Sequence, residues 1–156
     1  MALEIERRFL IKNDNWKKFI TKKIFIEQGY LSKSLDDWII RIRFTGKDYK
    51  IALKKHIESF TNFEFEYSIP RKDGETIMSN LSNRIKKERF FLEVEKKSWI
   101  IDCFKENNYP LEIAEIELSN EEEDFILPSF ISKEITGLKQ YFNFNLANEP
   151  FSKWKE

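Results

Sequence analysis

Hydrophobic and polar residues alternate along much of the chain, and this period of two indicates β-strands rather than helices. The alternating segments are rich in Ile, Phe and Tyr, residue types that favour a pleated and half-buried surface. Eight strands are predicted, over Leu3–Ile11, Ile24–Leu31, Trp38–Phe44, Tyr49–Lys55, Phe60–Ile69, Lys87–Val94, Ser98–Phe104 and Ile113–Leu118.

Short polar segments separate several of these strands. Thr45–Asp48, which contains Gly46, is typical of a hairpin turn, and Glu95–Lys97 is a second candidate. Helical patterns are weaker and fewer. They predict helices over Asp14–Lys23, Glu75–Ile85, Pro128–Ile135 and Leu138–Phe144.

The predicted elements indicate one β-rich domain. No Pro-, Gly- or Ser-rich linker divides residues 1–156, and no internal repeat is visible. Many strands with a few short helices favour the α+β class, built on an antiparallel sheet. Eight such strands most naturally close on themselves, so we expect an eight-stranded antiparallel β-barrel with a few peripheral helices.

The charged residues of these strands gather on one face of each strand. Residues i and i+2 share a face, so Glu4, Glu6 and Arg8 lie together. Apolar Ile5 and Phe9 occupy the opposite face. Five further pairs, each of one sign, follow the same pattern: Arg41 and Arg43, Lys50 and Lys54, Glu64 and Glu66, Lys87 and Arg89, and Glu115 and Glu117.

Two interpretations fit this pattern. The first is an ordinary antiparallel sheet with one face in water. The second is a barrel with apolar side chains outside and charges lining its lumen. Surface strands usually mix charge signs, whereas these are nearly pure, so acidic and basic pairs could face each other across a cavity. Four of the seven arginines also lie on these faces, and a guanidinium offers a planar fork that suits phosphate.

The amino-acid composition excludes several kinds of partner and of metal site. The 27 basic residues balance 27 acidic ones, so no net field attracts nucleic acid or an anionic membrane. One cysteine and one histidine exclude an intramolecular disulfide, a cysteine cluster and a zinc site with paired histidines. Paired carboxylates suit Mg²⁺ or Mn²⁺, which usually bridge protein oxygens to substrate phosphates. The several Lys and Arg side chains on these faces, together with a divalent ion, carry more positive charge than one phosphate needs, which favours a linear polyphosphate as ligand.

The sequence also predicts the cellular location of the protein and the kind of partner that it binds. No signal-peptide pattern and no apolar stretch of membrane-spanning length is visible, so a cytoplasmic location is expected. The expected partner is a small polyphosphate-containing substrate, without nucleic acid or membrane, and a homodimer is left open. His56 is predicted to be a solvated loop residue and Cys103 a small core residue.

Glu4-Ile5-Glu6-Arg7-Arg8 is similar to a Glu-x-Glu-x-Lys signature, and other short segments match the same pattern in order. They are Gln28–Leu31, Arg41–Arg43, Ala52–Lys54, Glu64–Glu66, Lys87–Arg89, Trp99–Asp102, Glu115–Glu117, Leu127–Pro128, Glu134–Gly137 and Tyr141–Asn143. Together they resemble the CYTH superfamily, the triphosphate tunnel metalloenzymes. The resemblance implies an eight-stranded tunnel, a divalent metal, and hydrolysis of a triphosphate, chiefly inorganic tripolyphosphate, to phosphate and pyrophosphate.

The resemblance also implies roles for individual residues. Those expected in catalysis are Glu4, Glu6, Arg8, Lys87 and Tyr30. The metal ligands would be Glu4, Glu6, Glu115 and Glu117, with Glu64 and Glu66 as further ligands or orienting groups. The phosphate chain would be held by Arg8, Arg41, Arg43, Lys54, Lys87 and Arg89. Asp102 and Lys50 are further candidate site residues without an assigned role. Tyr30 could equally be a core aromatic residue, and Asp102 a capping carboxylate.

Four positions depart from the family pattern. Arg8 replaces a usual Lys, and Asn62 replaces a common Arg before the second Glu-x-Glu pair. Ala52 replaces a frequent Thr, and Leu138 a common Asp. Three alternatives therefore stay open: a thiamine triphosphatase, an adenylyl cyclase, or a module that binds polyphosphate or nucleotide without turning it over.

Overall fold

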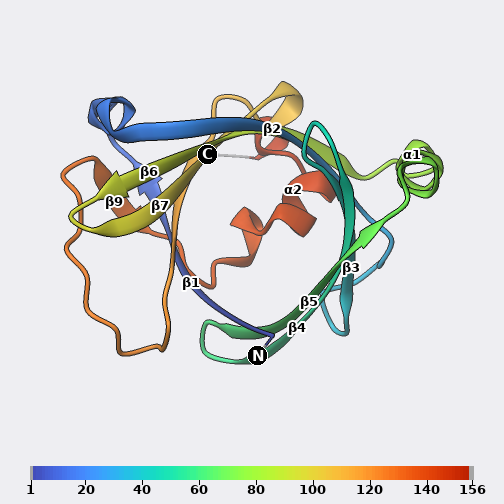
Figure 1. The fold of residues 1–156 in the computed structure, drawn as a ribbon, viewed down its shortest axis with the longest axis horizontal. Helices are drawn as coiled ribbons and strands as arrows, with labels where there is room; N and C mark the ends of the chain where they lie inside the picture. The colour runs from blue at the N-terminus through green and yellow to red at the C-terminus, as the bar shows by residue number, and fades with distance from the viewer. Residues whose placement is uncertain (1, 155–156) are drawn as a thin grey trace.

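A computed structural model describes residues 2–154, whose strands form an antiparallel sheet that closes into a barrel (Figure 1). Neighbouring strands follow the order β5-β4-β3-β2-β6-β7-β8-β1, and β1 returns to β5. The predicted eight-stranded antiparallel barrel is thus confirmed, with a short ninth strand added beside β1. The strands are β1 (Leu3–Ile11), β2 (Ile20–Tyr30), β3 (Ile39–Phe44), β4 (Tyr49–Glu58), β5 (Thr61–Ile69), β6 (Arg84–Val94), β7 (Lys97–Phe104), β8 (Glu112–Glu117) and β9 (Ile131–Glu134).

Strand β1 closes the barrel because two partners share one of its edges. Near its start, Glu4 lies opposite Asn62 of β5. Near its end, Phe9 and Ile11 pair with β9. The other edge of β1 pairs with β8, where Glu6 lies opposite Glu117. The two ends of the sheet therefore meet at β1.

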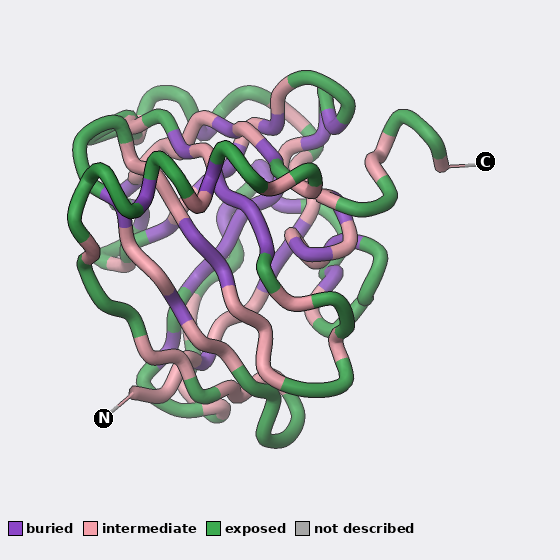
Figure 2. Tube along the Cα trace, turned by 90° about the vertical axis from the view of Figure 1, so that its right-hand side faces the viewer, coloured by how far each residue is buried: buried purple, intermediate pink, exposed green. Residues whose placement is uncertain are grey.

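The apolar face of the barrel wall points outward and is covered by chain segments. Ile5 and Phe9 of β1 pack in one buried cluster with Trp99 of β7. The covering residues are Trp16, on the 3₁₀ helix η1 (Asn15–Phe19), and Phe130. Burying each such side chain stabilises the fold by about 1.5–3 kcal/mol. Figure 2 shows the buried positions running along the strands, with exposed positions in the connecting turns.

Helix α1 (Arg71–Ser79) covers another part of the outer wall. Its Met78 packs against Ile42 of β3 and Tyr49 of β4. Gly74 faces the Tyr49 ring so closely that a Cβ atom there would clash with it. A side chain at this position would push the helix off the wall, which explains a glycine in the middle of a helix.

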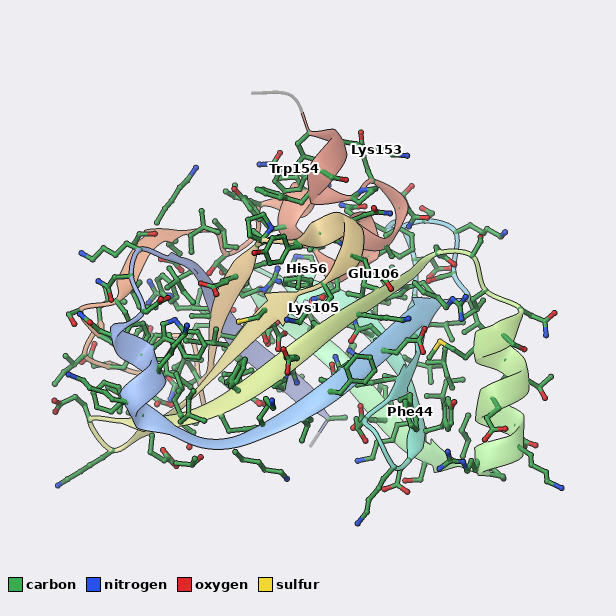
Figure 3. The ribbon with its side chains drawn as sticks, turned by 90° about the horizontal axis from the view of Figure 1, so that it is seen from above. Phe44, His56, Lys105, Glu106, Lys153 and Trp154 are labelled. Atoms are coloured by element: carbon green, nitrogen blue, oxygen red, sulfur yellow. The ribbon has the colours of Figure 1, made fainter. Side chains whose placement is uncertain are left out.

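Helix α2 (Asn143–Asn148) closes one end of the barrel instead of covering its wall. In Figure 1 it lies within the ring of strands, and in Figure 3 the C-terminal segment with Trp154 lies against one end of the barrel. Its Leu146 is buried with Ile85, Phe104 and Ile113, which fill that end. The sequence predicted a few peripheral helices, and α2 is positioned at the end of the barrel. The remaining short helices are η2 (Glu106–Asn108), η3 (Lys139–Tyr141) and η4 (Phe151–Lys153).

Both predicted hairpin turns are present. The Thr45 amide donates to the Asp48 carbonyl at 3.1 Å, and Gly46 between them has φ of 89°, which glycine adopts without strain. Glu95 and Lys96 connect β6 to β7 with φ of 50° and 62°. Two successive positive φ angles are typical of the turn that best matches the twist of a hairpin.

Several helix predictions are wrong, because sheet pairing prevails over local pattern. Over Asp14–Lys23 only η1 is helical, and β2 already begins at Ile20, paired with Leu92. The predicted Glu75–Ile85 helix lies earlier, at Arg71–Ser79, and β6 begins at Arg84. Pro128–Ile135 contains β9, and Leu138–Phe144 contains η3 and only the start of α2. No helix in the described residues is long and apolar enough to cross a membrane.

Candidate active site

Charged side chains from the wall strands line the lumen of the barrel. Because alternate residues point inward, the one-sign pairs of the sequence face a shared interior. Five of the charged candidates are buried there: Arg8, Arg41, Lys87, Asp102 and Glu115. The interpretation of an ordinary wet sheet face is therefore wrong for these residues, since a charge is buried only with partners or for a ligand.

Lys87 and Arg89 of β6 converge on Asp102 of β7. Lys87 Nζ lies 2.8 Å from Asp102 Oδ2, and Arg89 Nε donates to Asp102 Oδ1 at 2.8 Å. Burial alone would raise the pKa of Asp102, but Arg89 and Lys87 hold it well below its usual range. Asp102 is thus a lumen residue and not a capping carboxylate. One carboxylate balances two cations here, which leaves net positive charge for an anion.

Arg43 extends this positive region. Burial, reinforced by repulsion from Arg41 and Arg89, lowers the pKa of Arg43 below its usual range. Its Nε donates to Gln28 Oε1 at 2.9 Å, and Gln28 Nε2 donates to the Tyr30 hydroxyl at 2.7 Å. Gln28 is wholly buried and was missed as a site residue, although it shares the inward parity of Tyr30.

Arg8 and Arg41 each keep one buried donor without a partner. Arg8 Nε donates to Glu115 at 3.0 Å, and its Nη1 donates to the Tyr141 carbonyl at 2.9 Å. Arg41 Nη2 donates to Glu66 at 3.1 Å. Arg8 Nη2 and Arg41 Nε find no acceptor among the described residues. Unsatisfied buried donors on cations are what an absent anionic ligand would leave behind.

The acidic residues near the start of β1 surround Lys54. Lys54 Nζ lies 2.7 Å from Glu4 and 3.6 Å from Glu64. Burial alone would raise the pKa of Glu4, but Lys54 lowers it to about 2. Lys50, farther along the same face of β4, lies 3.8 Å from Glu66 and is more exposed than Lys54.

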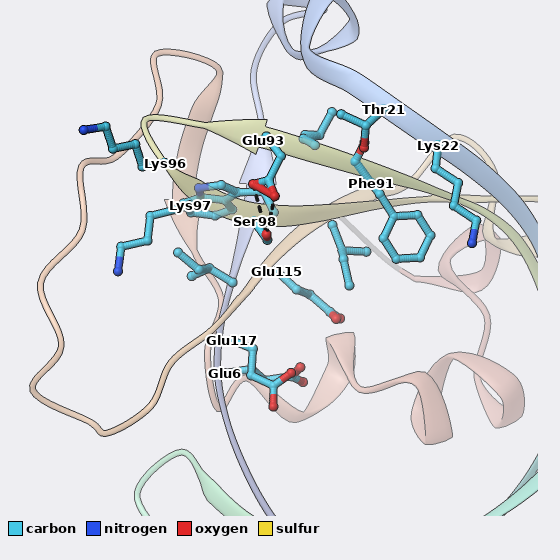
Figure 4. Close-up of a pocket in the computed structure, with 14 residues that line it drawn as sticks. Glu6, Thr21, Lys22, Phe91, Glu93, Lys96, Lys97, Ser98, Glu115 and Glu117 are labelled. Carbon is cyan, nitrogen blue, oxygen red and sulfur yellow. Dashed lines mark hydrogen bonds between the residues drawn. The ribbon is translucent and has the colours of Figure 1, made fainter.

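Glu6, Glu115 and Glu117 lie beside a cavity of about 650 Å³ (Figure 4). The carboxylates of Glu6 and Glu117 point toward the same space in that view. Burial, followed by repulsion from Glu115 and Glu4, raises the pKa of Glu6 to about 8. Burial and the same two charges also raise the pKa of Glu117, although its residue is exposed. These carboxylates repel one another, which a bound cation would relieve.

The donor set fits a hard divalent cation. All candidate ligands are carboxylate oxygens, which Mg²⁺ and Mn²⁺ prefer, and their mutual repulsion favours a cation between them. Within residues 2–154, no three acidic, histidine or cysteine side chains already form a compact ligand cluster. The fit therefore rests on donor chemistry and charge.

A second cavity, of about 370 Å³, shares Glu6 with the first. It is lined by Arg8, Arg41 and Lys54 on the wall and by Asn143 and Phe144 of α2. Tyr30 also lines it, packed edge-to-face on Phe144 with ring centroids 5.4 Å apart. Asn143 accepts a hydrogen bond from Lys87 Nζ at 3.1 Å. Asn143 appears in the family-like segment near the C-terminus, but nothing in the sequence places it inside the barrel.

Two single-residue predictions have different outcomes. Cys103 is half-buried against the outer cluster, and burial raises its pKa to about 12, as for an unreactive thiol. His56 is exposed, but it lies in strand β4 and lines the second cavity, so its placement in a loop is wrong. The strand continues past Lys55 because His56 pairs with Asn62 of β5.

Comparison with known proteins agrees with this geometry. No family model matches the chain. An inorganic triphosphatase of Acetivibrio thermocellus is 34% identical, over the full length of both chains. One from Nitrosomonas europaea is 28% identical over 92% of this chain and 96% of its own. A crystal structure of an inorganic triphosphatase superposes with a TM-score of 0.69 at 28% identity, covering 94% of this chain and 95% of that one.

These similarities extend from end to end of the chain, and the closed antiparallel barrel has the predicted charges inside it. By sequence and by fold, the chain belongs to the CYTH superfamily of triphosphate tunnel proteins, together with these inorganic triphosphatases.

Proposed function

We propose that this protein hydrolyses inorganic tripolyphosphate to phosphate and pyrophosphate, with Mg²⁺ or Mn²⁺ as cofactor. The observation that carries the proposal is the pair of buried donors, Arg8 Nη2 and Arg41 Nε, that lack acceptors within residues 2–154 and lie beside crowded carboxylates. A polyphosphate would satisfy the donors, and its metal ion would satisfy the carboxylates. The curated relatives described above are inorganic triphosphatases, which supports the same substrate class.

The basic residues would bind and orient the substrate. Arg8, Arg41 and Arg43 offer planar guanidinium forks to the phosphate oxygens, while Lys87 and Arg89 supply charge at the closed end. Phosphoryl transfer needs mainly positioning and charge neutralisation, so rigid cations are the main contribution of this part of the site.

The acidic residues would hold the metal. Glu6, Glu115 and Glu117 face one cavity, and Glu4, Glu64 and Glu66 lie closer to Lys54, Lys50 and Arg41 as further ligands or orienting groups. A bound divalent ion neutralises phosphate charge and assists the attack of water on a terminal phosphorus. Leu146 of α2 packs with Ile85, Phe104 and Ile113 at one end of the lumen, where Lys87 and Asp102 are shut off from water.

A panel of substrates tests the proposal. Phosphate release is measured from tripolyphosphate, ATP and thiamine triphosphate, each with Mg²⁺, with Mn²⁺ and with EDTA. Fastest release from tripolyphosphate, lost in EDTA, is expected. Release confined to thiamine triphosphate would make that compound the substrate, and formation of cyclic AMP from ATP would make the protein an adenylyl cyclase. Binding without turnover would make the barrel a binding module. A cytoplasmic location and a homodimer are parts of the proposal for fractionation and light scattering to test.

A further inference from the structure

We infer that His56 binds the outer end of the substrate at the mouth of the second cavity, held in position by Asn62. The inference rests on the proposed function, because it names one more group for the same phosphate chain. His56 lies on β4 two residues beyond Lys54, so both side chains point to the same side of the wall. One strand repeat of about 6.6–6.8 Å places it farther out toward solvent.

A row of three side chains crosses the seam where the barrel closes. His56 of β4 lies opposite Asn62 of β5, and Asn62 lies opposite Glu4 of β1. The side chains follow the same row: His56 Nδ1 lies 3.2 Å from Asn62 Oδ1, and Asn62 Nδ2 lies 3.3 Å from Glu4 Oε1. The imidazole ring is therefore held against the wall although the residue is exposed.

The hydrogen bonds along this row also determine which imidazole nitrogen of His56 carries a hydrogen. Glu4 pairs with the Lys54 ammonium at 2.7 Å, so its carboxylate only accepts hydrogen bonds. Asn62 must then turn its NH₂ group to Glu4 and its carbonyl oxygen to His56. His56 Nδ1 consequently carries a hydrogen, and Nε2 is the nitrogen left for a ligand. Protonation of Nε2 turns it into a charged donor suited to phosphate oxygen.

His56 shares its cavity with the unpartnered donors of Arg8 and Arg41. A triphosphate that satisfies these two arginines within the cavity of about 370 Å³ has its outer end toward the mouth, where His56 lies. Histidine titrates near neutral pH, unlike the arginines. Affinity for the substrate should therefore fall as His56 loses its proton.

Charged groups of both signs face His56 across this cavity. Acidic ones are Asp36 and Asp37 of the loop before β3, Glu6 of β1, and Glu4 behind Asn62. Basic ones are Arg8, Arg41, Lys54 and, from η3, Lys139. The pKa of Glu6 is raised to about 8 by burial and by repulsion from Glu115 and Glu4, so Glu6 also changes its charge near neutral pH, and the contribution of His56 is the part of the pH dependence that His56→Gln removes.

Nuclear magnetic resonance can test the inference directly, because His56 is the chain's single histidine and its imidazole signals need no assignment. The expected tautomer of the full-length protein above its midpoint is the one with hydrogen on Nδ1, and Asn62→Ala should turn it into a mixture. Tripolyphosphate, added without divalent metal, should raise the titration midpoint by about one pH unit for a tenfold preference for the charged form. An unchanged midpoint, or hydrogen on Nε2, would overturn the inference.

Kinetics with Mg²⁺ on the same preparation separate the two proposals. The KM for tripolyphosphate should rise about tenfold more from pH 6 to pH 8 in the native protein than in His56→Gln, as expected for loss of a charge-assisted hydrogen bond. At pH 6 the KM of His56→Gln should be about tenfold above that of the native protein, and at pH 8 the KM of His56→Lys should be about tenfold below it, while Lys72→Gln on the outer helix α1 should match the native protein at both pH values. If His56→Gln hydrolyses tripolyphosphate and its KM changes with pH as much as that of the native protein, the role of His56 is refuted and the proposed hydrolysis stands. If tripolyphosphate shifts the titration midpoint of His56 but is not hydrolysed, the proposed hydrolysis is refuted and the role of His56 in binding stands.

Discussion

Lys87 and Asp102 form an ion pair that is shut off from water, with Nζ and Oδ2 2.8 Å apart and side chains that are 0% and 1% exposed. Charges at this depth are tolerated only in pairs, and Arg89 shares the same carboxylate. The pair joins β6 to β7 inside the barrel and sets the positive charge of its closed end.

Asp102→Asn should therefore destabilise the fold strongly. It leaves Lys87 and Arg89 buried without their counter-charge, and removal of one member of a buried pair costs about 3–5 kcal/mol. Urea denaturation measures the loss. Asp14→Asn, which breaks an exposed pair with Lys17, is the matched control and should change the free energy of unfolding by about 0.5 kcal/mol or less. Equal stability of Asp102→Asn and the native protein would contradict the prediction.

The same pair predicts a pH dependence of stability. Burial, opposed by Asp102 and reinforced by Arg89 and Arg43, lowers the pKa of Lys87 from 10.5 to about 7. Between these values the unfolded chain binds more protons than the folded one, so Lys87 makes stability rise with pH, by at most about 1.4 kcal/mol per pH unit. Lys87→Met should lose this rise in urea titrations from pH 7 to 10. Parallel profiles of the two proteins would contradict the prediction.

Carboxylate substitutions should separate metal binding from folding. At pH 9, above the raised pKa of Glu6 of about 8, Glu6→Gln removes a negative charge that Glu115 and Glu4 repel, so without metal its melting temperature should rise, by about 2–4 °C for each kcal/mol gained. Glu117→Gln, at an exposed position, should fold normally. Both should lose most turnover, and in calorimetry Mg²⁺ should stabilise them much less than it stabilises the native protein. Full turnover of both variants at limiting metal would refute the ligand assignment.

An anion should stabilise the basic part of the lumen by mass action. Tripolyphosphate should raise the melting temperature of the native protein more than phosphate does at the same concentration. Arg43→Ala relieves repulsion from Arg41 and Arg89, so it should remain folded, yet it should lose much of that rise. A full rise in Arg43→Ala, or none in the native protein, would mean that these residues do not form one site.

Asn62→Arg should lower the KM for tripolyphosphate. The position faces the second cavity, and a charge-assisted hydrogen bond is worth roughly 1.5–3 kcal/mol, or about ten- to a hundredfold in affinity. An unchanged KM at both pH 6 and pH 8 would show that the new guanidinium pairs with Glu4 instead of substrate.

Strand alternation was enough to predict the wall and the face of each charged residue. Glu4 and Glu6, Arg41 and Arg43 all point into the lumen as their parity requires. Strand β9 was missed because a short apolar run around Ile131 reads equally well as a helix. Only its pairing with Ile11 of β1 makes it a strand.

The sequence did not predict which residues of neighbouring strands lie opposite each other. Asp102 and Arg89 lie opposite each other only because of the register between β6 and β7, which neither strand specifies alone. Gln28 was missed because a neutral amide carries no charge signal, and Asn143 because its position depends on how α2 enters the barrel end. His56 was assigned to a loop because the strand pattern weakens after Lys55.

The outward-facing core has a consequence for how such a protein can change. Ile5 and Phe9 stabilise the wall from outside, while Glu4, Glu6 and Arg8 on the same strand work inside it. An exchange of one inward residue therefore leaves the outer packing intact, and substitutions in the two layers that lie more than about 7–10 Å apart should be nearly additive in stability. New phosphate ligands can in this way be selected at the inner positions without first rebuilding the scaffold that holds them.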